Sequence, residues 1–177
     1  MVAAACILAS QEHHALIRDS KQLTPEQREE AFRWLTQHAV FGIGMVPAGT
    51  IDRIGILPAT EQAMQQAVMH VSQHAKPTFL LVDGRDHFWF DIPHASIVRG
   101  DESEPCIAAA SIVAKVTRDR LMTAASSVYA PYGFSQHKGY GTEAHFAAIR
   151  KYGVCAIHRR TFLIKSEIRY PEYSTVS

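Results

Sequence analysis

The chain has 177 residues, enough for a domain with a sizeable hydrophobic core. Its composition, 47% hydrophobic and 20% charged, is typical of an ordinary soluble globular protein. A net charge of +1 does not by itself indicate a polyanionic partner, and no apolar run approaches the roughly 20 residues that span a bilayer.

The first residues and the cysteines indicate a cytoplasmic protein. Residues 2–8 are apolar but have no basic leader before them, so they predict a strand rather than a signal peptide. Cys6, Cys106 and Cys155 are odd in number and show no CxxC spacing. This favours buried reduced thiols over a disulfide or a zinc site.

Charge is unevenly distributed along the chain. Residues 131–177 contain 7 Lys/Arg against 3 Asp/Glu, a net charge of +4, whereas residues 1–130 have a net charge of −3. Such an asymmetry is typical of a nucleic-acid footprint, and ordinary fluctuation over a solvated surface explains it equally well.

A well-signalled helix follows the first strand. Thr24 is the predicted N-cap, Pro25 stands at the first helical position, and Gln27 completes a capping box. This helix should run to about His38, and a strand through residues 39–46 should follow it.

The middle of the chain predicts a second helix that begins near Pro58. One apolar face is formed by residues that recur every four positions, which are Ala59, Ala63, Ala67 and Val71.

Two short strands and a long helix come next. The strands are expected at residues 79–82 and at about 95–98. The helix is rich in small residues through 107–120, with Ser103 as its predicted N-cap and Pro105 in its first turn.

The last third begins with a loop-like segment, residues 129–142. Thr142 is predicted to cap a last helix that Gly153 ends. Strands that alternate with helices predict an α/β sheet covered by helices, and the absence of repeats and linkers predicts a single domain over residues 1–177.

Two carboxylates, Asp83 and Asp119, stand near the ends of different elements. Asp83 follows an apolar strand, and ligands gather at the carboxyl ends of strands in open α/β sheets. Both are therefore candidate ligands for a divalent metal such as Mg²⁺. Taken alone, Asp83 with Gly84 also fits a plain turn, and Asp119 fits an ion pair with Arg118 or Arg120.

Six segments in a fixed order carry a family resemblance. Together they closely resemble type II ribonuclease H (ribonuclease HII). They are Asp19-Ser-Lys-Gln-Leu-Thr24, Leu81-Val-Asp-Gly84, Arg99-Gly-Asp101, Ala108-Ala-Ala-Ser-Ile-Val-Ala-Lys-Val-Thr-Arg-Asp119, His137-Lys-Gly-Tyr-Gly-Thr142 and His158-Arg159.

The resemblance implies a ribonuclease H-like α/β fold with a mixed five-stranded sheet, flanking helices and a basic C-terminal region, here about residues 129–177. It implies endonucleolytic cleavage of RNA in RNA–DNA hybrids, and at ribonucleotides embedded in DNA, in replication and repair. Family members use Mg²⁺ or Mn²⁺ and four carboxylates, of which Asp83 and Asp119 match the third and fourth. The expected partner is therefore a hybrid or ribonucleotide-containing duplex, with no membrane and no obligate protein partner.

One departure from the family pattern concerns the start of the chain. Family members begin with a strand that carries Asp-Glu-x-Gly-Arg-Gly, and this chain contains no such motif. In the family this strand lies between the second strand and the one that ends at Asp83. Our hypothesis is a mis-called start, with Met1 where the family has valine, and we expect residues 1–177 alone to be impaired because two metal ligands are missing.

The resemblance also suggests nucleic-acid contacts at five positions. Tyr140 is expected to pack on a sugar near the 2′-OH, with Lys138, Lys115, Lys21 and Arg159 at phosphates. The alternatives are a surface-packed tyrosine and ordinary surface or structural cations.

Two other functions remain open from the sequence. A non-catalytic module that binds hybrids through its basic residues would show salt-sensitive binding without cleavage. An α/β enzyme of another class, such as a nucleotide-binding transferase, is disfavoured because no Gly-rich phosphate loop follows any strand.

Overall fold

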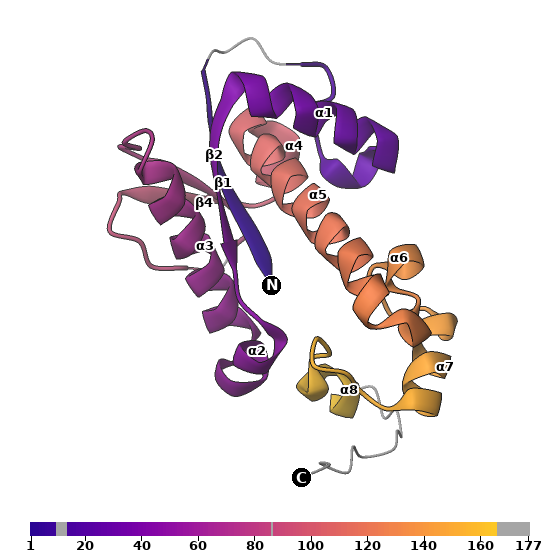
Figure 1. The fold of residues 1–177 in the computed structure, drawn as a ribbon. Coiled ribbons are helices and arrows are strands. Elements are labelled where there is room, and N and C mark those ends of the chain that lie inside the picture. The colour runs from indigo at the N-terminus through magenta and orange to yellow at the C-terminus, as the bar shows by residue number, and fades with distance from the viewer. Residues whose placement is uncertain (10–13, 86, 166–177) are drawn as a thin grey trace. The chain divides into compact units, whose positions relative to one another are not determined.

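A computed structural model describes residues 1–9, 14–85 and 87–165 (Figure 1). The chain forms two compact units, one of residues 1–46 and 57–117 and the other of residues 47–56 and 118–177. The end of the expected basic region, residues 166–177, lies outside the described residues. No helix in the described ranges combines the length and the apolar character needed to cross a membrane.

The first unit begins with an antiparallel pair of strands. β1 (Val2–Leu8) pairs with β2 (Ala39–Met45), so that Val2 lies opposite Met45 and Leu8 opposite Ala39. The helix between them, α1 (Pro25–His38), has the predicted capping box at Thr24 and Gln27. These strand and helix predictions are confirmed.

Close backbone packing joins β2 to α3 (Ile56–Ser72). The predicted apolar face of α3 is confirmed, because Ala59, Ala63, Ala67 and Val71 are all buried. A Cβ at Gly44 would overlap the carbonyl oxygen of Ala63, and one at Gly42 would lie 2.6 Å from the backbone nitrogen of Val71. Alanines on the helix and glycines on the strand therefore let the two backbones touch.

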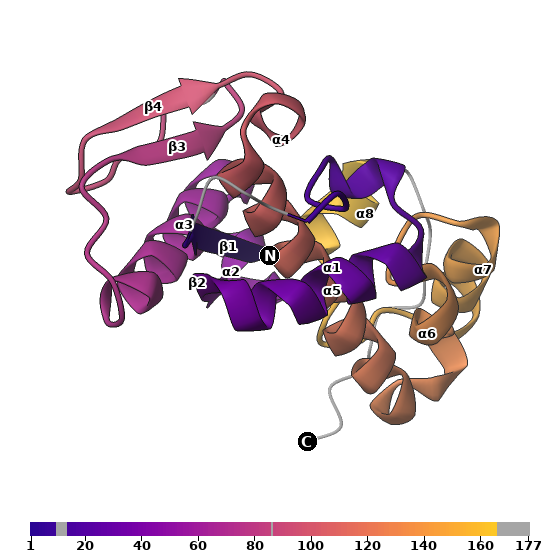
Figure 2. The same cartoon turned by 90° about the horizontal axis from the view of Figure 1, so that it is seen from above.

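The second pair of strands is parallel and lies next to α4 in Figure 2. β3 (Leu80–Asp83) pairs with β4 (His94–Ile97), which confirms both predicted strands within one residue. Phe88 and Phe90, in the connection between them, pack on Val82.

The N-cap prediction for the long helix is wrong. Ser103 is the last residue of a separate one-turn helix, α4 (Gly100–Ser103), and the long helix α5 (Pro105–Val128) begins two residues later. The reason is local: Glu104 has an extended backbone, with φ −115° and ψ 111°, and its N–H donates to Gly100 to close the short helix. Pro105 does stand in the first turn of α5, as predicted.

The main core of the first unit lies between α1, α5 and the β1–β2 pair. Leu35 of α1 and Ile112 of α5 are fully buried, and Ala4 and Cys6 of β1 pack against this cluster. Burial, with Cys106 as a second cause, raises the pKa of Cys6 to about 12, so this thiol stays protonated at neutral pH. All three cysteines are free.

The second unit contains more helix than the sequence predicted. Its first segment, residues 47–56, contains a helix that was not predicted, α2 (Ala48–Ile54). The segment expected as a loop, residues 129–142, contains the short helices η2 (Ala130–Tyr132) and α6 (Phe134–His137). These turns form because Tyr132 and Phe134 are buried as a stacked pair, with ring centroids 5.5 Å apart.

The end of the second unit confirms one cap and adds one helix. Thr142 caps α7 (Glu143–Tyr152) and Gly153 ends it, as predicted. It is not the last helix, because α8 (Arg160–Lys165) follows, and its first backbone N–H groups donate to Asp52 of α2.

Parallel and antiparallel pairings both occur, as in a mixed sheet. The described residues contain four strands in two separate pairs, β1–β2 and β3–β4, rather than one five-stranded sheet. Among the strands of the described residues, β1 and β3 each have a partner on one side only.

Gly44→Ala tests the close approach of β2 to α3. We expect it to lower the free energy of unfolding by about 2 kcal/mol, because the added methyl group overlaps the Ala63 backbone. Gly49→Ala is the matched control, since its added Cβ meets no atom within 4 Å, and it should be neutral or stabilise helix α2 by up to about 1 kcal/mol. Urea unfolding measures both; equal stability of Gly44→Ala and the unmodified chain would contradict the packing.

Candidate active site

The carboxylate of Asp83 is fixed at the end of β3. Its Oδ1 accepts a hydrogen bond from the N–H of Gly100 at 2.9 Å, and the residue is exposed. The next residue, Gly84, has φ 108° and donates its N–H to Ile97 of β4 at 2.9 Å. Asp83 is thus the last residue of β3, paired with Ile97, and the bend begins at Gly84; its carboxylate is oriented and accessible.

A second group of charged residues lies in the same unit as Asp83. Lys21 donates to Asp101 Oδ2 at 2.9 Å and lies 4.0 Å from Asp19 Oδ1. Both carboxylates are buried, with residue exposures of 4% for Asp101 and 7% for Asp19, so each needs a partner. The hydrogen bond to Asp101, together with the charges of Asp101, Asp19 and Asp83, raises the pKa of Lys21 against the opposing effect of desolvation.

Asp19 organises the loop before α1. Its Oδ1 accepts the backbone N–H of Lys21 at 2.9 Å and caps the short helix η1 (Ser20–Gln22). This holds the Lys21 backbone in the position from which its side chain reaches Asp101.

Asp119 belongs to the second unit, and Asp83 to the first. Asp119 is half-buried on α5, with its Oδ1 3.6 Å from Nη1 of Arg118. The ion-pair alternative for this residue is therefore observed, although a screened pair at this distance does not prevent a carboxylate from binding a cation.

Arg118 connects Asp119 to the loop that carries Tyr140. Its Nη2 donates to the carbonyl oxygen of Lys138 at 2.9 Å, and its guanidinium lies 4.7 Å from the centroid of the Tyr140 ring. Tyr140 is 53% exposed, so one part of the ring remains accessible to a ligand.

Two buried histidines, His145 and His158, form a hydrogen-bond network with the backbone of the loop that carries Tyr140. The Cys155 N–H donates to His158 Nδ1 at 2.9 Å, the Nε2 atoms of His158 and His145 are 3.0 Å apart, and His145 Nδ1 lies 2.9 Å from the Tyr140 carbonyl oxygen. This order of donors and acceptors is consistent only if His158 carries its proton on Nε2 and His145 on Nδ1. Both rings are then neutral, and the network holds the backbone of Tyr140.

The other candidate nucleic-acid residues have different surroundings. Lys138 donates to Thr123 Oγ1 at 2.8 Å and to the Ser135 carbonyl, so its ammonium group is used within its own unit. The guanidinium of Arg159 lies 3.8 Å from the Phe162 ring centroid; burial, and then the charge of Arg118, lowers the pKa of Arg159. Lys115 is half-buried on α5.

The described residues offer an incomplete donor set for a metal ion. Within the described ranges, no three His, Cys, Asp or Glu side chains gather closely enough to hold one. Asp83 and Asp119 are hard oxygen donors of the kind that Mg²⁺ and Mn²⁺ accept. The chemistry of these two side chains therefore suits such an ion, but two carboxylates are too few ligands to hold it.

Comparisons with known proteins give the class and then the family. The fold is that of ribonuclease H-type nucleases: a ribonuclease HII from Archaeoglobus fulgidus, solved in complex with PCNA, has a TM-score of 0.74 at 18% identity, covering 97% of this chain and 90% of that one. The ribonuclease H2 of Pyrococcus horikoshii OT3 has a TM-score of 0.66 at 23% identity, covering 95% and 97%.

The sequence comparisons agree with the fold. The family model for ribonuclease HII matches residues 1–165. The ribonuclease HII of Chlamydia caviae is 46% identical over 164 residues, which are 92% of this chain and 76% of that protein. That of Acholeplasma laidlawii is 45% identical over 163 residues, 92% and 79% of the two chains. The chain therefore belongs to the ribonuclease HII family, a family of endoribonucleases.

Sequence reasoning missed three parts of this site. Asp101 was placed in the family-like segment Arg99-Gly-Asp101 but was given no role of its own, although its position shortly after a predicted strand was a usable signal. Arg118 was treated only as a neighbour of Asp119, and its contacts with Lys138 and Tyr140 carry no sequence pattern. His145 was not recognised as the partner of His158, because a contact across 13 residues has no helical or strand periodicity.

The histidine network predicts a loss of stability in mild acid. Burial, and then the neighbouring His145, lowers the pKa of His158 from 6.5 to about 4, so the fold favours the neutral ring. Stability should be complete above pH 6.5 and fall by about 2–3 kcal/mol as the pH drops from 6.5 to 4, where the unfolded chain binds the proton first. Urea unfolding at several pH values measures this.

Two variants separate His158 from the other titrating groups. His158→Gln should flatten the decline between pH 6.5 and 4, while His74→Gln, at an exposed histidine, should leave it unchanged. An NMR titration in which the His158 ring protonates near pH 6.5 in the folded protein would contradict the network.

Proposed function

We propose that this chain provides two carboxylates, Asp83 and Asp119, to an active site that cleaves RNA in RNA–DNA hybrids and at ribonucleotides embedded in DNA. The observation that carries the proposal is the Asp83 carboxylate, exposed at the end of β3 and oriented by the Gly100 N–H, in a chain of the ribonuclease HII family. Asp119 is the second candidate because it ends the family-like segment on α5.

The proposed ligands are suited to a two-metal hydrolysis. Asp83 and Asp119 would hold Mg²⁺ or Mn²⁺, and two such ions supply an activated water and neutralise charge on the leaving oxygen, which leaves 5′-phosphate and 3′-hydroxyl ends. Neighbouring residues of the chain would orient the carboxylate oxygens of Asp83 and Asp119. Gly100 does so for Asp83, and Arg118 lies beside Asp119.

The incomplete donor set leads to a second part of the proposal. Two carboxylates neutralise two dications poorly, so metal binding by residues 1–177 alone should be weak. We therefore propose that the chain as printed cleaves hybrids slowly.

Substrate contacts are proposed for the surface around Tyr140. An exposed aromatic ring stacked under a guanidinium offers a flat platform to a nucleotide sugar or base. Arg159 and Lys21 are proposed to add phosphate contacts, in which case a phosphate competes with Asp101 for Lys21. Lys138 and Lys115 are weaker candidates, since Lys138 is engaged with Thr123 and Lys115 is half-buried.

A second candidate function is hybrid binding without cleavage. It is favoured by the same Tyr140 surface, which does not depend on the metal ligands. It differs from the first in predicting salt-sensitive binding with no metal-dependent turnover.

Cleavage of a labelled RNA–DNA hybrid at millimolar Mg²⁺ or Mn²⁺ tests the proposed function. We expect slow cleavage that leaves 3′-hydroxyl ends and that Asp83→Asn reduces by about 100-fold or more, because the variant removes a charge from the metal site. Asp91→Asn, at another exposed aspartate of the same unit, is the control and should keep the rate. Equal rates for Asp83→Asn and the control would exclude Asp83 as a ligand, and fast turnover by the unmodified chain would refute the impairment.

Tyr140 variants test the contact surface independently of catalysis. Tyr140→Ala should weaken hybrid binding about tenfold, because stacking on a nucleotide contributes roughly 1–3 kcal/mol. Tyr140→Phe keeps the ring against Arg118 and should keep most of the affinity while losing preference for the hybrid over a DNA duplex. Fluorescence anisotropy in Ca²⁺ measures both; unchanged binding by Tyr140→Ala would remove Tyr140 from the interface.

A further inference from the structure

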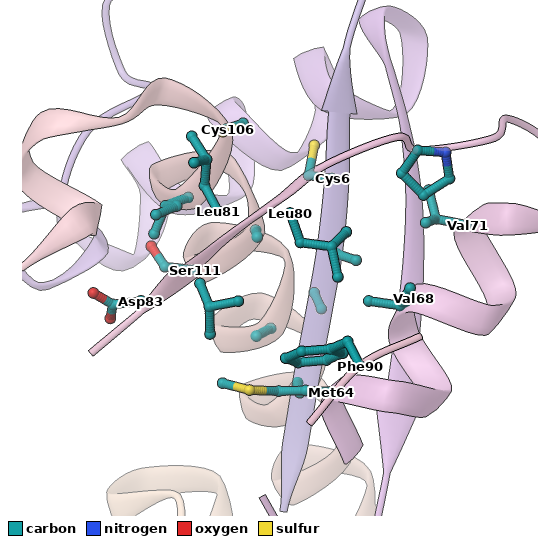
Figure 3. A pocket seen from close by; sticks show the side chains of 18 of the residues that line it. Cys6, Met64, Val68, Val71, Leu80, Leu81, Asp83, Phe90, Cys106 and Ser111 are labelled. Carbon is teal, nitrogen blue, oxygen red and sulfur yellow. The ribbon is translucent and has the colours of Figure 1, made fainter. Parts of the chain in front are cut away.

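A groove of about 620 Å³ lies in the first unit, between the two pairs of strands (Figure 3). Its lining consists mostly of hydrophobic side chains, such as Val68, Leu80 and Phe90. A protein that tells a ribose from a deoxyribose needs a hydrogen bond to the 2′-OH, and such a lining offers few polar groups for one. Tyr140 of the second unit, by contrast, carries its hydroxyl on an exposed ring.

The chain before Tyr140 lies directly on one face of α5. Lys138 and Gly139 both have left-handed backbones, with φ 51° and 77°. A Cβ at Gly139 would lie 3.1 Å from Met122 Cε and 4.0 Å from Arg118 Nη2. These two side chains are four residues apart on α5, so they share one face of the helix. The loop that carries Tyr140 is therefore built on this face.

The contacts of Arg118 show which neighbour fixes its guanidinium. Nη2 donates to the Lys138 carbonyl oxygen at 2.9 Å, and the guanidinium lies over the Tyr140 ring, 4.7 Å from its centroid. Nη1 is buried and has no hydrogen-bond partner among the described residues. Its distance of 3.6 Å to Asp119 Oδ1 is too long for a hydrogen bond. The loop, more than Asp119, therefore sets the position of the guanidinium.

Different residues hold the backbone and the ring of Tyr140. The backbone N–H donates to the His137 carbonyl oxygen at 2.8 Å, and the backbone carbonyl oxygen accepts from the His145 ring at 2.9 Å. The ring lies against Arg118. Removal of the guanidinium should therefore leave the backbone in place and change the direction of the ring.

We propose that Arg118 is a positioning residue for ribose recognition, because its guanidinium fixes the direction of the Tyr140 ring and hence the place of the phenolic hydroxyl. The inference rests on the proposed function of Tyr140. A planar guanidinium donates a hydrogen bond at its edge while its face lies on a ring, and the compact ammonium of a lysine does not do both. Arg118 thus determines the preference for a hybrid over a DNA duplex.

Arg118→Lys tests the proposal, because it keeps the charge and loses the flat group. Fluorescence anisotropy in Ca²⁺, at one salt concentration, compares a hybrid with a DNA duplex of the same sequence. We expect the preference for the hybrid to fall at least about fivefold, since one stacking contact and one hydrogen bond are lost. Affinity for the DNA duplex should change by less than about twofold, because phosphate contacts remain. Arg120→Lys, at an exposed arginine of the same helix, is the control and should keep the preference.

The same substitution in a Tyr140→Phe background shows whether Arg118 acts through the phenolic hydroxyl. With no hydroxyl to place, Arg118→Lys should change the preference by less than about twofold. A merely structural role of Arg118 would lower both affinities together and would persist in the Tyr140→Phe background. Thermal unfolding checks the fold. If Arg118→Lys shows no cooperative transition, Arg118→Met, which keeps an apolar stem, takes its place with the same expectation.

The other outcomes separate this inference from the proposed function. A preference that Tyr140→Phe removes and Arg118→Lys keeps would overturn the inference alone. An equal loss of affinity for both nucleic acids, or an effect that persists without the hydroxyl, would also overturn it. An unmodified chain with no preference for the hybrid, in which Tyr140→Phe changes nothing, would overturn the proposed role of Tyr140 and this inference with it.

Discussion

The parallel pairing of β3 with β4 is the constraint on which the arrangement of the first unit depends. Parallel strands end at the same edge of a sheet, so the residues after both strands meet there. This pairing brings the N–H of Gly100 to the Asp83 carboxylate. The next residue, Asp101, then becomes buried and takes Lys21 as its counter-ion. A short stretch of main-chain hydrogen bonding thus orders charged groups that come from three distant parts of the sequence.

In the second unit, side chains and not strand pairing position the candidate residue Tyr140. Arg118 contacts the Lys138 carbonyl and the Tyr140 ring, and neutral His145 and His158 hold the Tyr140 backbone from the other direction. The exposed Tyr140 is therefore held by contacts within its own unit, at its ring by Arg118 and at its backbone by His145. A rigid aromatic loses little conformational entropy on binding, which suits a residue that is proposed to contact a nucleotide.

Local signals in the sequence predicted much of the fold. The capping box at Thr24 and the alanine periodicity from Ala59 predicted α1 and the face of α3, because both depend on neighbouring residues. The separation of the strands into two pairs was not predictable from such signals, since partner choice depends on contacts far apart in sequence. The same limit explains the missed role of Asp101, whose burial is visible only once Lys21 lies beside it. Asp83 was predicted as a candidate ligand because strand ends have a recognisable pattern, and the structure confirms its position at the end of β3.

The central proposal is that the Asp83 carboxylate at the end of β3 is a ligand for a divalent cation. Substoichiometric Mn²⁺ added to ¹⁵N-labelled protein tests it, because the ion broadens the amide signals of nearby residues. The proposal predicts that the Gly84 signal broadens, that Asp83→Asn abolishes this broadening, and that Asp91→Asn, at another exposed aspartate, leaves it unchanged. No broadening at Gly84, or broadening that Asp83→Asn leaves unchanged, would contradict it.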